Sequence, residues 1–287
     1  MWHSIANQIA DALQRPFVIR RRESLLQDDD CRRMLVEDDS LSLFVKLLPR
    51  HQAEQLAVEM RGLHCLAQSR ALKIPHPYCC GVAGDHCFLA MEFLPMETGT
   101  EPQWFTLGAA LADLHGSQEQ AMYGWDEDNF FLHMTQPNQW QRNWAQFFAE
   151  QRIGWQLQLL AEKGIHLMPI HELVETVRRL LANHQPSPAL LHGNLWCGNL
   201  GFTAGNGVLF DPACYFGDRE VDLAMSELFG ALPDPFYQGY ASQWQAPAGH
   251  EIRKQVYNLY PLLAHLNRYG EAYRRPVEHH LHQLLAL

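Results

Sequence analysis

The sequence predicts an α+β protein with two lobes, a small β-rich lobe over residues 1–95 and a larger helical lobe over residues 96–287. Two patterns support this class. Alternating apolar residues and β-formers dominate between residues 40 and 95, and from residue 103 onward apolar residues recur at helical spacing. A chain of 287 residues is long enough to form a well-buried core in each of two lobes.

Composition excludes several classes of protein. Hydrophobic residues make up 47% and aromatic residues 11%, so extensive disorder is not expected. The net charge of −10 argues against binding to nucleic acid or to an anionic membrane. No apolar run reaches the roughly 18–20 residues of a membrane span. Residues 1–17 have the pattern of an amphipathic helix and not of a signal peptide. The seven cysteines are irregularly spaced and are expected to be reduced thiols, which predicts a cytoplasmic protein.

In the small lobe, the pattern predicts three strands and a helix. Residues 40–48 alternate as a strand that carries Lys46, and residues 50–69 form a helix that carries Glu59. Residues 75–95 read as two strands around a turn at Gly84-Asp85. The expected lobe is therefore a sheet with one helix after the strand of Lys46.

The large lobe is predicted to be mostly helical. Helices are expected at 105–117, within 136–164 and at 170–184, and the short strands 199–203 and 207–211 form a hairpin through "AGNG". Further helices follow to residue 287, with breaks at Pro233, Pro235, Pro247 and Pro276.

Lys46 and Glu59 have two interpretations. Taken alone, they are a surface lysine on a strand and a solvated glutamate on a helix. In phosphoryl transfer, the same pairing has a function, because the lysine holds the α- and β-phosphates of a nucleotide and the glutamate holds the lysine by an ion pair. The second interpretation needs support from the large lobe.

That support comes from "LLHGNLWCGN" at residues 190–199. His192 and Gly193 precede Asn194, Asn199 follows five positions later, and Asp211 ends the next strand. An amide and a carboxylate at this spacing are suited to hold Mg²⁺, which prefers a few protein oxygens together with phosphates and water. Separately, Asn199 is a turn-former and Asp211 a cap before a proline. Together with Lys46 and Glu59, they predict a site for ATP and Mg²⁺.

Three neighbouring positions carry further alternatives. Asp222 begins an apolar helix, so it is either a helix cap or a buried brace for the loop that contains Asn194. Trp196 either stacks on a sugar or belongs to the core. Arg219 and Glu220 are expected to form an ion pair or to be solvated.

These motifs resemble the fructosamine/ketosamine-3-kinase family, which is related to the aminoglycoside phosphotransferases. The resemblance covers most of the chain, and its most specific stretches are about 138–153 and 190–225. It implies a bilobal protein-kinase-like fold and transfer of a phosphoryl group from ATP-Mg²⁺ to a sugar hydroxyl of a glycated amine. Lys46, Glu59, Asn199 and Asp211 stand at matching positions. "MEFLP" matches the hinge, where backbone groups of Glu92, Phe93 and Leu94 meet adenine.

Two departures from the family pattern affect the handling of the γ-phosphate. Asn194 stands where the family has an aspartate that takes up the proton of the attacking hydroxyl, and removal of such a base usually costs about 10²–10⁴ in rate. The loop before Lys46 lacks the family's glycines and carries Asp28, Asp29 and Asp30 instead. These carboxylates would repel a triphosphate unless they form a solvated turn that faces away.

Two functions remain open at this point. The first is a phosphotransferase whose turnover is slow or absent. Natural loss of catalysis explains both departures from the family pattern, whereas an engineered substitution would explain only Asn194. The second is a pseudokinase that binds a nucleotide or a glycated ligand as a regulatory module without chemistry.

Three C-terminal histidines resemble a metal site but are expected on a solvated helix face: His279, His280 and His282.

Overall fold

The computed structural model describes residues 1–27, 31–69 and 72–286, and it confirms the α+β class with an N-terminal sheet and a helical region. The chain divides into two compact units. Unit 1 comprises residues 1–99 and 201–212, and unit 2 comprises residues 100–200 and 213–287. The boundary after residue 95 stays a prediction, and each unit is described by itself. In the described part of the chain, no helix is long and apolar enough to cross a membrane.

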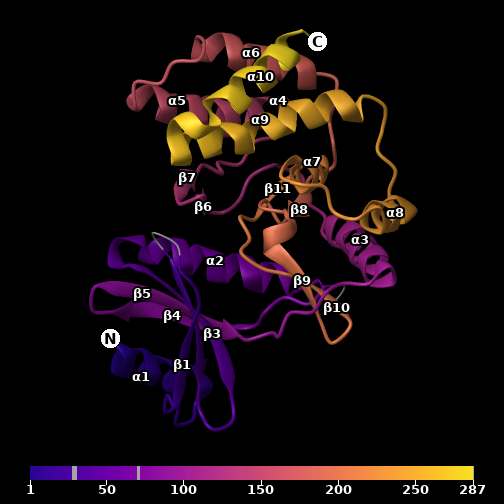
Figure 1. The fold of residues 1–287 in the computed structure, drawn as a ribbon. Helices are drawn as coiled ribbons and strands as arrows, with labels where there is room; N and C mark the ends of the chain where they lie inside the picture. The colour runs from indigo at the N-terminus through magenta and orange to yellow at the C-terminus, as the bar shows by residue number, and fades with distance from the viewer. Residues whose placement is uncertain (28–30, 70–71, 287) are drawn as a thin grey trace. The chain divides into compact units, whose positions relative to one another are not determined.

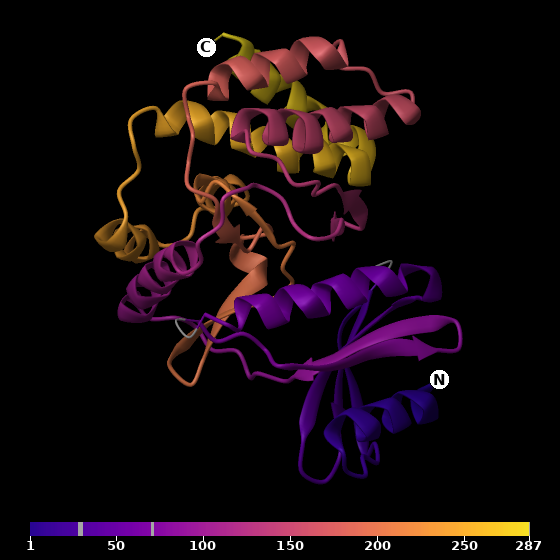
Figure 2. The ribbon, with the colours of Figure 1, turned by 180° about the vertical axis from the view of Figure 1, so that it is seen from behind.

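Unit 1 is built on a five-stranded antiparallel sheet with the order β1-β2-β3-β5-β4. Figures 1 and 2 show two helices on its opposite faces, α1 (Trp2–Leu13) and α2 (Ala53–Leu66). Both central strands are almost fully buried because both faces of the sheet are covered. The strands are β1 (Arg21–Gln27), β2 (Arg32–Glu37), β3 (Ser42–Pro49), β4 (Pro77–Ala83) and β5 (His86–Glu92).

The sequence predicts most of this unit. α1 buries Ile5 and Ile9 against the sheet, as its amphipathic pattern requires. The helix expected at 50–69 begins as a 3₁₀ turn, η1 (Arg50–Gln52), and continues as α2. Strands β1 and β2 were not predicted, because β1 is an exposed edge strand and both strands carry several charged residues.

A hairpin that lies about 100 residues beyond the rest of unit 1 in the sequence completes this unit. Its strands are β9 (Leu200–Thr203) and β10 (Asn206–Leu209), as the "AGNG" turn predicts. Lys73 N–H donates to the Gly207 carbonyl at 3.1 Å, and Leu209 N–H donates to the Lys73 carbonyl at 3.2 Å. Glu97 N–H also donates to the Phe202 carbonyl at 2.8 Å. These bonds attach the segment that carries Asp211 to the sheet unit.

Unit 2 contains two closely packed helices, α3 (Glu101–Gly116) and α8 (Asp234–Gln243). A Cβ on Gly108 would lie 1.9 Å from the Phe236 carbonyl oxygen, and one on Gly239 would lie 1.9 Å from that of Phe105. Only glycine allows the two backbones to approach so closely. Thr100 and Gln103 cap the start of α3 reciprocally.

The remaining helices of unit 2 surround a large apolar core (Figure 1). The long helix expected within 136–164 is present but contains a π-helical segment, η2 (Ala149–Gly154), between α4 (Trp144–Phe148) and α5 (Trp155–Glu162). Pro276 does not separate two helices, because it lies in the first turn of α10, where a missing N–H is tolerated. The others are α6 (Ile170–Leu181), α7 (Glu220–Leu228), α9 (His250–Tyr269), η4 (Gly270–Tyr273) and α10 (Arg274–Leu285).

Short strands position the loop of Asn194 in unit 2. β8 (Ala189–Leu191) leads into this loop and pairs antiparallel with β11 (Tyr215–Gly217). A 3₁₀ turn, η3 (Cys197–Asn199), ends the loop. The hairpin of β6 (Asn129–Phe131) and β7 (Met134–Gln136) is separate. Strands of three residues are too short to show a clear period in the sequence, and none of these four was predicted.

Candidate functional site

Unit 1 brings Lys46, Glu59 and Asp211 together in one buried cluster. Lys46 Nζ lies 2.7 Å from Glu59 Oε1 and 2.6 Å from Asp211 Oδ1. The side chains of Lys46 and Glu59 are 8% and 7% exposed, whereas Asp211 is 35% exposed. The interpretation of Lys46 and Glu59 as solvated surface residues is therefore wrong, and the predicted ion pair is present.

The electrostatics of this cluster follow from one cation that serves two carboxylates. Burial alone would lower the pKa of Lys46, but Asp211 and Glu59 outweigh it and raise that pKa. Burial raises the pKa of Glu59 to about 7, and the negative charge of Asp211 adds to this effect while Lys46 opposes it. Lys46 therefore stays charged, and the cluster holds one negative charge in excess when both carboxylates are ionised.

Strand register adds a second cation to this face of the sheet. Arg33 on β2 is the cross-strand partner of Lys46 on β3. Directly paired residues of an antiparallel sheet project to the same face. The positive charge of Arg33 also lowers the pKa of Glu59. Asp28, Asp29 and Asp30, which precede β2, lie outside the described residues, so the predicted acidic loop stays a prediction.

Asp211 has a backbone conformation that is rare for its residue type. Its φ is +59°, in the left-handed region that glycine adopts freely and other residues adopt at a cost. Residues held in such conformations cluster at functional sites, where the surrounding structure compensates the strain. The contact with Lys46 and the attachment of the β9–β10 hairpin to unit 1 provide that compensation here.

The predicted hinge lies at the end of β5. Phe93 and Leu94 are half-buried beyond the last strand residue, Glu92. The Glu92 N–H already donates to the His76 carbonyl at 2.8 Å, and its carboxylate accepts two hydrogen bonds from Lys73. Glu92 thus anchors the segment, and Phe93 and Leu94 remain the candidates for backbone contacts to a base.

In unit 2, the loop of Asn194 has an enforced shape. Gly193 has a φ of +75°, and a Cβ there would lie 2.0 Å from the Ala213 carbonyl oxygen. Asp222 accepts N–H bonds from His192 at 2.7 Å and from Gly193 at 2.9 Å. The aspartate is fully buried at the start of α7 and holds the backbone of the loop, as the brace interpretation predicts.

A third group that the sequence did not indicate completes this brace. His115 Nε2 lies 3.1 Å from Asp222 Oδ2, and His115 Nδ1 lies 2.7 Å from the Tyr240 hydroxyl. Burial alone would raise the pKa of Asp222, but hydrogen bonds from His115 and Gly193 and the charges of His115 and His192 lower it. The carboxylate is therefore ionised and fully engaged.

Asn194 and Asn199 lie in the same loop. Asn199 is 4% exposed, and its Nδ2 donates to the Asn194 carbonyl at 2.9 Å. The role of Asn199 as a metal ligand stays a prediction. Asn194 is half-buried, and its N–H lies 3.3 Å from His192 Nδ1. The His192 side chain is fully buried. A direct chemical role for it stays a prediction.

Two other predicted features have clear positions. Trp196 is 38% exposed, so it is not a core residue, and its contact with a sugar stays a prediction. The expectation of a solvated face is wrong for His280, which is 8% exposed and lies 2.6 Å from the Gln255 carbonyl. Burial lowers the pKa of His280. His279 and His282 are exposed, as expected.

A buried polar network supports the segment after Asp211 and was missed in the sequence. Asn129 Nδ2 donates to the Cys214 carbonyl at 2.7 Å, and Asn129 Oδ1 accepts from Gln136 and Asn138. Arg152 is fully buried in the π-helical segment and donates to Asn138 Oδ1 at 2.7 Å. All four residues fall in or beside stretches that carry the family resemblance, which is the signal that could have identified them.

A second buried ionic network lies beside the start of α7. Ligand atoms of His184, Asp218 and Glu220 lie within 4.8 Å of one another, a spacing that a metal site could use. Arg253 donates to both carboxylate oxygens of Glu220, at 2.8 and 2.7 Å. Asp218 accepts from the Tyr257 hydroxyl and contacts His184. These partners already engage both carboxylates. The expected pairing of Arg219 with Glu220 is wrong, since Glu220 pairs with Arg253.

The chain resembles known proteins over its whole length. The fructosamine kinase family model matches residues 1–287. A ketoamine kinase homologue of Vibrio parahaemolyticus is 42% identical over 274 residues, or 95% of each chain. The crystal structure of a fructosamine-3-kinase homologue from Haemophilus somnus has a TM-score of 0.95 at 34% identity and covers 99% of this chain and 98% of its own.

A more distant likeness concerns the fold alone. An aminoglycoside phosphotransferase in a ternary complex with AMP-PNP and hygromycin B has a TM-score of 0.66 at 12% identity, over 99% of this chain and 98% of its own. The protein-kinase-like fold expected from the sequence is thereby confirmed.

Proposed function

Because this chain belongs to the fructosamine kinase family, we propose that it is built to transfer the γ-phosphoryl group of ATP to a sugar hydroxyl of a glycated amine. The family membership supports phosphotransfer. We further propose that Asn194 makes this turnover slow, since an amide cannot accept the proton of the attacking hydroxyl. The acidic loop at Asp28, Asp29 and Asp30 would act in the same direction.

The observation that carries the proposal is the buried Lys46, held between Glu59 and Asp211. A fully charged lysine is costly to bury and is retained where a negative ligand or partner requires it. In the proposed complex, Lys46 holds the α- and β-phosphates and Glu59 keeps it in place. Arg33, its cross-strand partner, would add a second positive charge.

Asn199 and Asp211 fit the requirements of Mg²⁺. They provide an amide oxygen and a carboxylate, which are hard oxygen ligands, and Mg²⁺ completes its coordination with phosphates and water. When bound, Mg²⁺ neutralises charge on the transferred phosphoryl group. The hydrogen bond from Asn199 Nδ2 to the Asn194 carbonyl links the proposed metal ligand to the base position.

The proposed step needs a destination for one proton. The acceptor hydroxyl oxygen forms a bond to the γ-phosphorus, the bond from that phosphorus to the β–γ bridging oxygen breaks, and ADP leaves. Asn194 can orient the hydroxyl but cannot hold its proton, which must pass to solvent or to a phosphate oxygen. The transition state is loose, so positioning retains part of the rate. Trp196, exposed beside this position, is proposed to stack on the sugar.

The substitution Asn194→Asp tests this proposal. We expect ATP turnover with a fructosamine acceptor to rise by about 10²–10⁴-fold, because the carboxylate restores the general base. The assay measures ADP release and the phosphorylated acceptor. Asn183→Asp, which makes the same chemical change at an exposed position, is the matched control and should leave turnover unchanged. Absence of any gain in Asn194→Asp would place the defect elsewhere and contradict the role assigned to residue 194.

A second function is favoured by Asn194 itself. A pseudokinase would keep the nucleotide and lose only the chemistry. The retained Lys46, Glu59 and Asp211, in a chain with an amide at the base position, fit this function. Thermal unfolding with ATP and Mg²⁺ separates binding from turnover. Ligand at 100 times its Kd stabilises the folded protein by about 2.7 kcal/mol. Binding together with an inactive Asn194→Asp variant would favour the pseudokinase.

The acceptor and the location are proposed only as classes. Family relatives named as ketoamine kinases support a small glycated amine as acceptor. The absence of a nucleic-acid or membrane partner stays a prediction from the net charge of −10. A cytoplasmic location stays a prediction from the cysteine content and the reducing environment it implies.

A further inference from the structure

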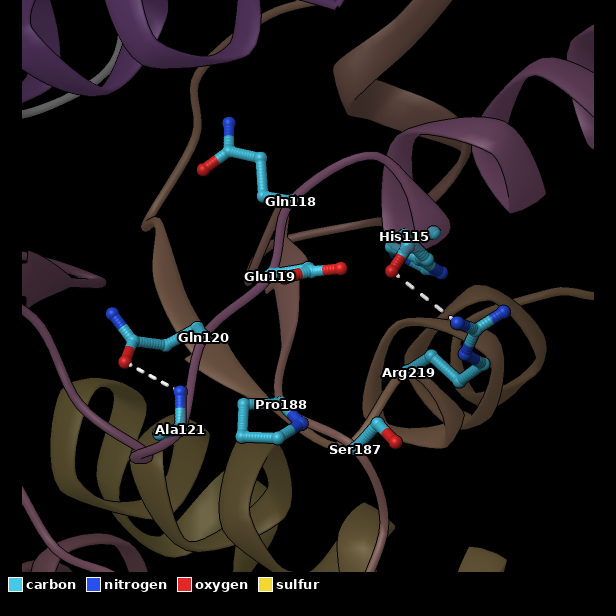
Figure 3. Close-up of a pocket in the computed structure, with 9 residues that line it drawn as sticks. His115, Gln118, Glu119, Gln120, Ala121, Ser187, Pro188 and Arg219 are labelled. Carbon is cyan, nitrogen blue, oxygen red and sulfur yellow. Dashed lines mark hydrogen bonds between the residues drawn. The ribbon is translucent and has the colours of Figure 1, made fainter.

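Unit 2 contains a polar pocket that has no place in the proposed phosphotransfer. It lies where the end of α3, the segment that follows α3, the residues before β8 and Arg219 meet (Figure 3). Its volume is about 570 Å³. Sites for small molecules usually have volumes of about 300–1,000 Å³, so the pocket is large enough for one small ligand.

Arg219 provides the positive charge of the pocket. One guanidinium N–H donates to the His115 carbonyl at 3.2 Å, as Figure 3 shows, and the group also contacts the Tyr240 hydroxyl. The guanidinium stacks on Trp244, 5.1 Å from the ring centre, which fixes its plane. A guanidinium has five N–H donors. These contacts use only part of that set, and Arg219 lines the pocket.

Glu119 provides a negative charge in the same pocket. It lies on the exposed segment after α3, between Gln118 and Gln120. Gln120 Oε1 accepts the Ala121 N–H at 2.7 Å, so the Gln120 amide nitrogen is left as a donor. Ser187 contributes a hydroxyl from the opposite segment. The lining thus combines one cation, one carboxylate and several neutral hydrogen-bonding groups.

This balance of charge selects the chemistry of the ligand. A simple anion would be attracted by Arg219 and repelled by Glu119, and a simple cation would meet the reverse. A molecule with both charges pairs with both residues, and a carboxylate matches the planar guanidinium in a two-point contact. We propose that this pocket binds a small zwitterion that carries a carboxylate and an ammonium group, the chemistry of an α-amino acid, and that the catalytic loop senses its binding.

A short chain of contacts connects the pocket to the loop. Arg219 holds the His115 carbonyl, and the His115 imidazole contacts Asp222 at 3.1 Å. Asp222 accepts the N–H groups of His192 and Gly193. A carboxylate that draws Arg219 toward the pocket changes the first contact of this chain. The effect reaches the loop backbone without any contact between the ligand and Asn194.

Calorimetric titration with matched probes tests the binding. L-alanine carries both charges, N-acetyl-L-alanine lacks the ammonium and L-alaninamide lacks the carboxylate. We expect L-alanine to bind roughly tenfold more tightly than either analogue, the scale of one partly exposed charge-assisted hydrogen bond. N-fructosyl-alanine, which keeps both charges, distinguishes a glycated ligand from a free amino acid. Equal binding of all the probes, or no binding at 10 mM, overturns the proposal.

Two substitutions assign each charge to its residue. In Arg219→Gln, L-alanine and L-alaninamide should bind equally, because the carboxylate has lost its partner. In Glu119→Gln, L-alanine and N-acetyl-L-alanine should bind equally. The controls Arg142→Gln and Glu162→Gln change exposed residues outside the pocket and should keep the tenfold preference. If Arg219→Gln unfolds, Arg219→Lys keeps the charge but loses the planar two-point contact, so the preference for L-alanine over L-alaninamide should fall below tenfold. A full tenfold preference in that variant would contradict the assignment.

Amide resonances of the loop test the coupling. L-alanine should shift the His192 and Gly193 N–H signals in the wild-type protein, and the shift should disappear in Arg219→Gln. This readout and the calorimetry need no turnover, so a failure of the proposed kinase activity leaves both results interpretable. Binding without any shift at either amide would refute the connection to the catalytic loop.

Discussion

The two units contain buried charges of opposite sign. In unit 1, one buried ammonium, that of Lys46, serves two carboxylates, and one of these is 35% exposed. In unit 2, one buried carboxylate, that of Asp222, is surrounded by donors from His115, His192 and Gly193. The first cluster has a carboxylate partner, Asp211, that is partly open to solvent, whereas in the second both carboxylate oxygens are engaged.

This difference indicates which charged side chain is expected to change its partners when a ligand binds. In the proposed complex, Lys46 would exchange Asp211 for a phosphate, because both partners are anions and Asp211 is partly exposed. Asp222 has no comparable alternative, because release of any donor would leave an N–H group buried without an acceptor. The first cluster is suited to bind a ligand, and the second is suited to hold a loop.

The largest expected effect follows from removal of the brace. Asp222→Ala leaves three donors in a fully buried place and should lower the free energy of unfolding by about 3–5 kcal/mol. Urea denaturation followed by circular dichroism measures this loss. Asp113→Ala changes an exposed aspartate on α3 and serves as the control. A loss below about 1 kcal/mol would show that the two clusters do not differ in the way proposed.

Removal of the shared cation should have a smaller effect on stability and a larger one on binding. Lys46→Met should lower the free energy of unfolding by about 1–3 kcal/mol, because Glu59 can take up a proton when its partner is lost. The stabilisation by ATP and Mg²⁺ in thermal unfolding should disappear. Lys163→Met removes a lysine from unit 2 and should preserve the response to nucleotide. A Lys46→Met protein that still responds to ATP would rule out the assigned site.

The smallest expected effect concerns pH. The pKa of Glu59 is raised from 4.5 to about 7, so between these values the folded protein holds a proton that the unfolded chain has released. Its contribution to stability is therefore complete below about pH 4.5 and is lost as the pH rises through 7. Glu59→Gln should flatten the pH dependence of unfolding in this window, as measured by denaturation at several pH values.

Asp38 provides the contrast for that experiment. Burial alone would raise its pKa, but hydrogen bonds from Arg15 and from backbone N–H groups lower it from 3.8 to about 2. Its stabilisation is present above about pH 3.8 and is lost as the pH falls toward 2. Because the two windows do not overlap, a change in Glu59→Gln below pH 4 would indicate a different origin.

The parts of the fold with a strong local period were predicted from the sequence. The strand of Lys46, the helix of Glu59 and the "AGNG" hairpin each occur where expected, because apolar spacing and turn residues determine them locally. The exposed strands β1 and β2 and the three-residue strands of unit 2 were missed. Their pairing depends on distant partners and leaves little trace in the local pattern.

The candidate site shows the same division. Lys46, Glu59 and Asp211 were predicted because their spacing has a known chemical use, and the structure brings them into contact. His115 was not predicted, since its partner Asp222 is 107 positions away in the sequence. Arg152 was missed for a similar reason, because a buried arginine acts through the carbonyl, amide and aromatic groups that tertiary packing places around it.

The β9–β10 hairpin has a consequence for how the chain is made. Unit 1 needs residues 201–212, which follow 101 residues of the other unit. At translation rates of about 5–20 residues per second, the first 99 residues wait roughly 6–23 s before Asp211 and Phe202 leave the ribosome. During this interval the nascent unit lacks the β9–β10 hairpin and Asp211, a carboxylate partner of Lys46. Completion of unit 1 on the ribosome therefore depends on a segment that is translated only after residues 100–200 of the other unit.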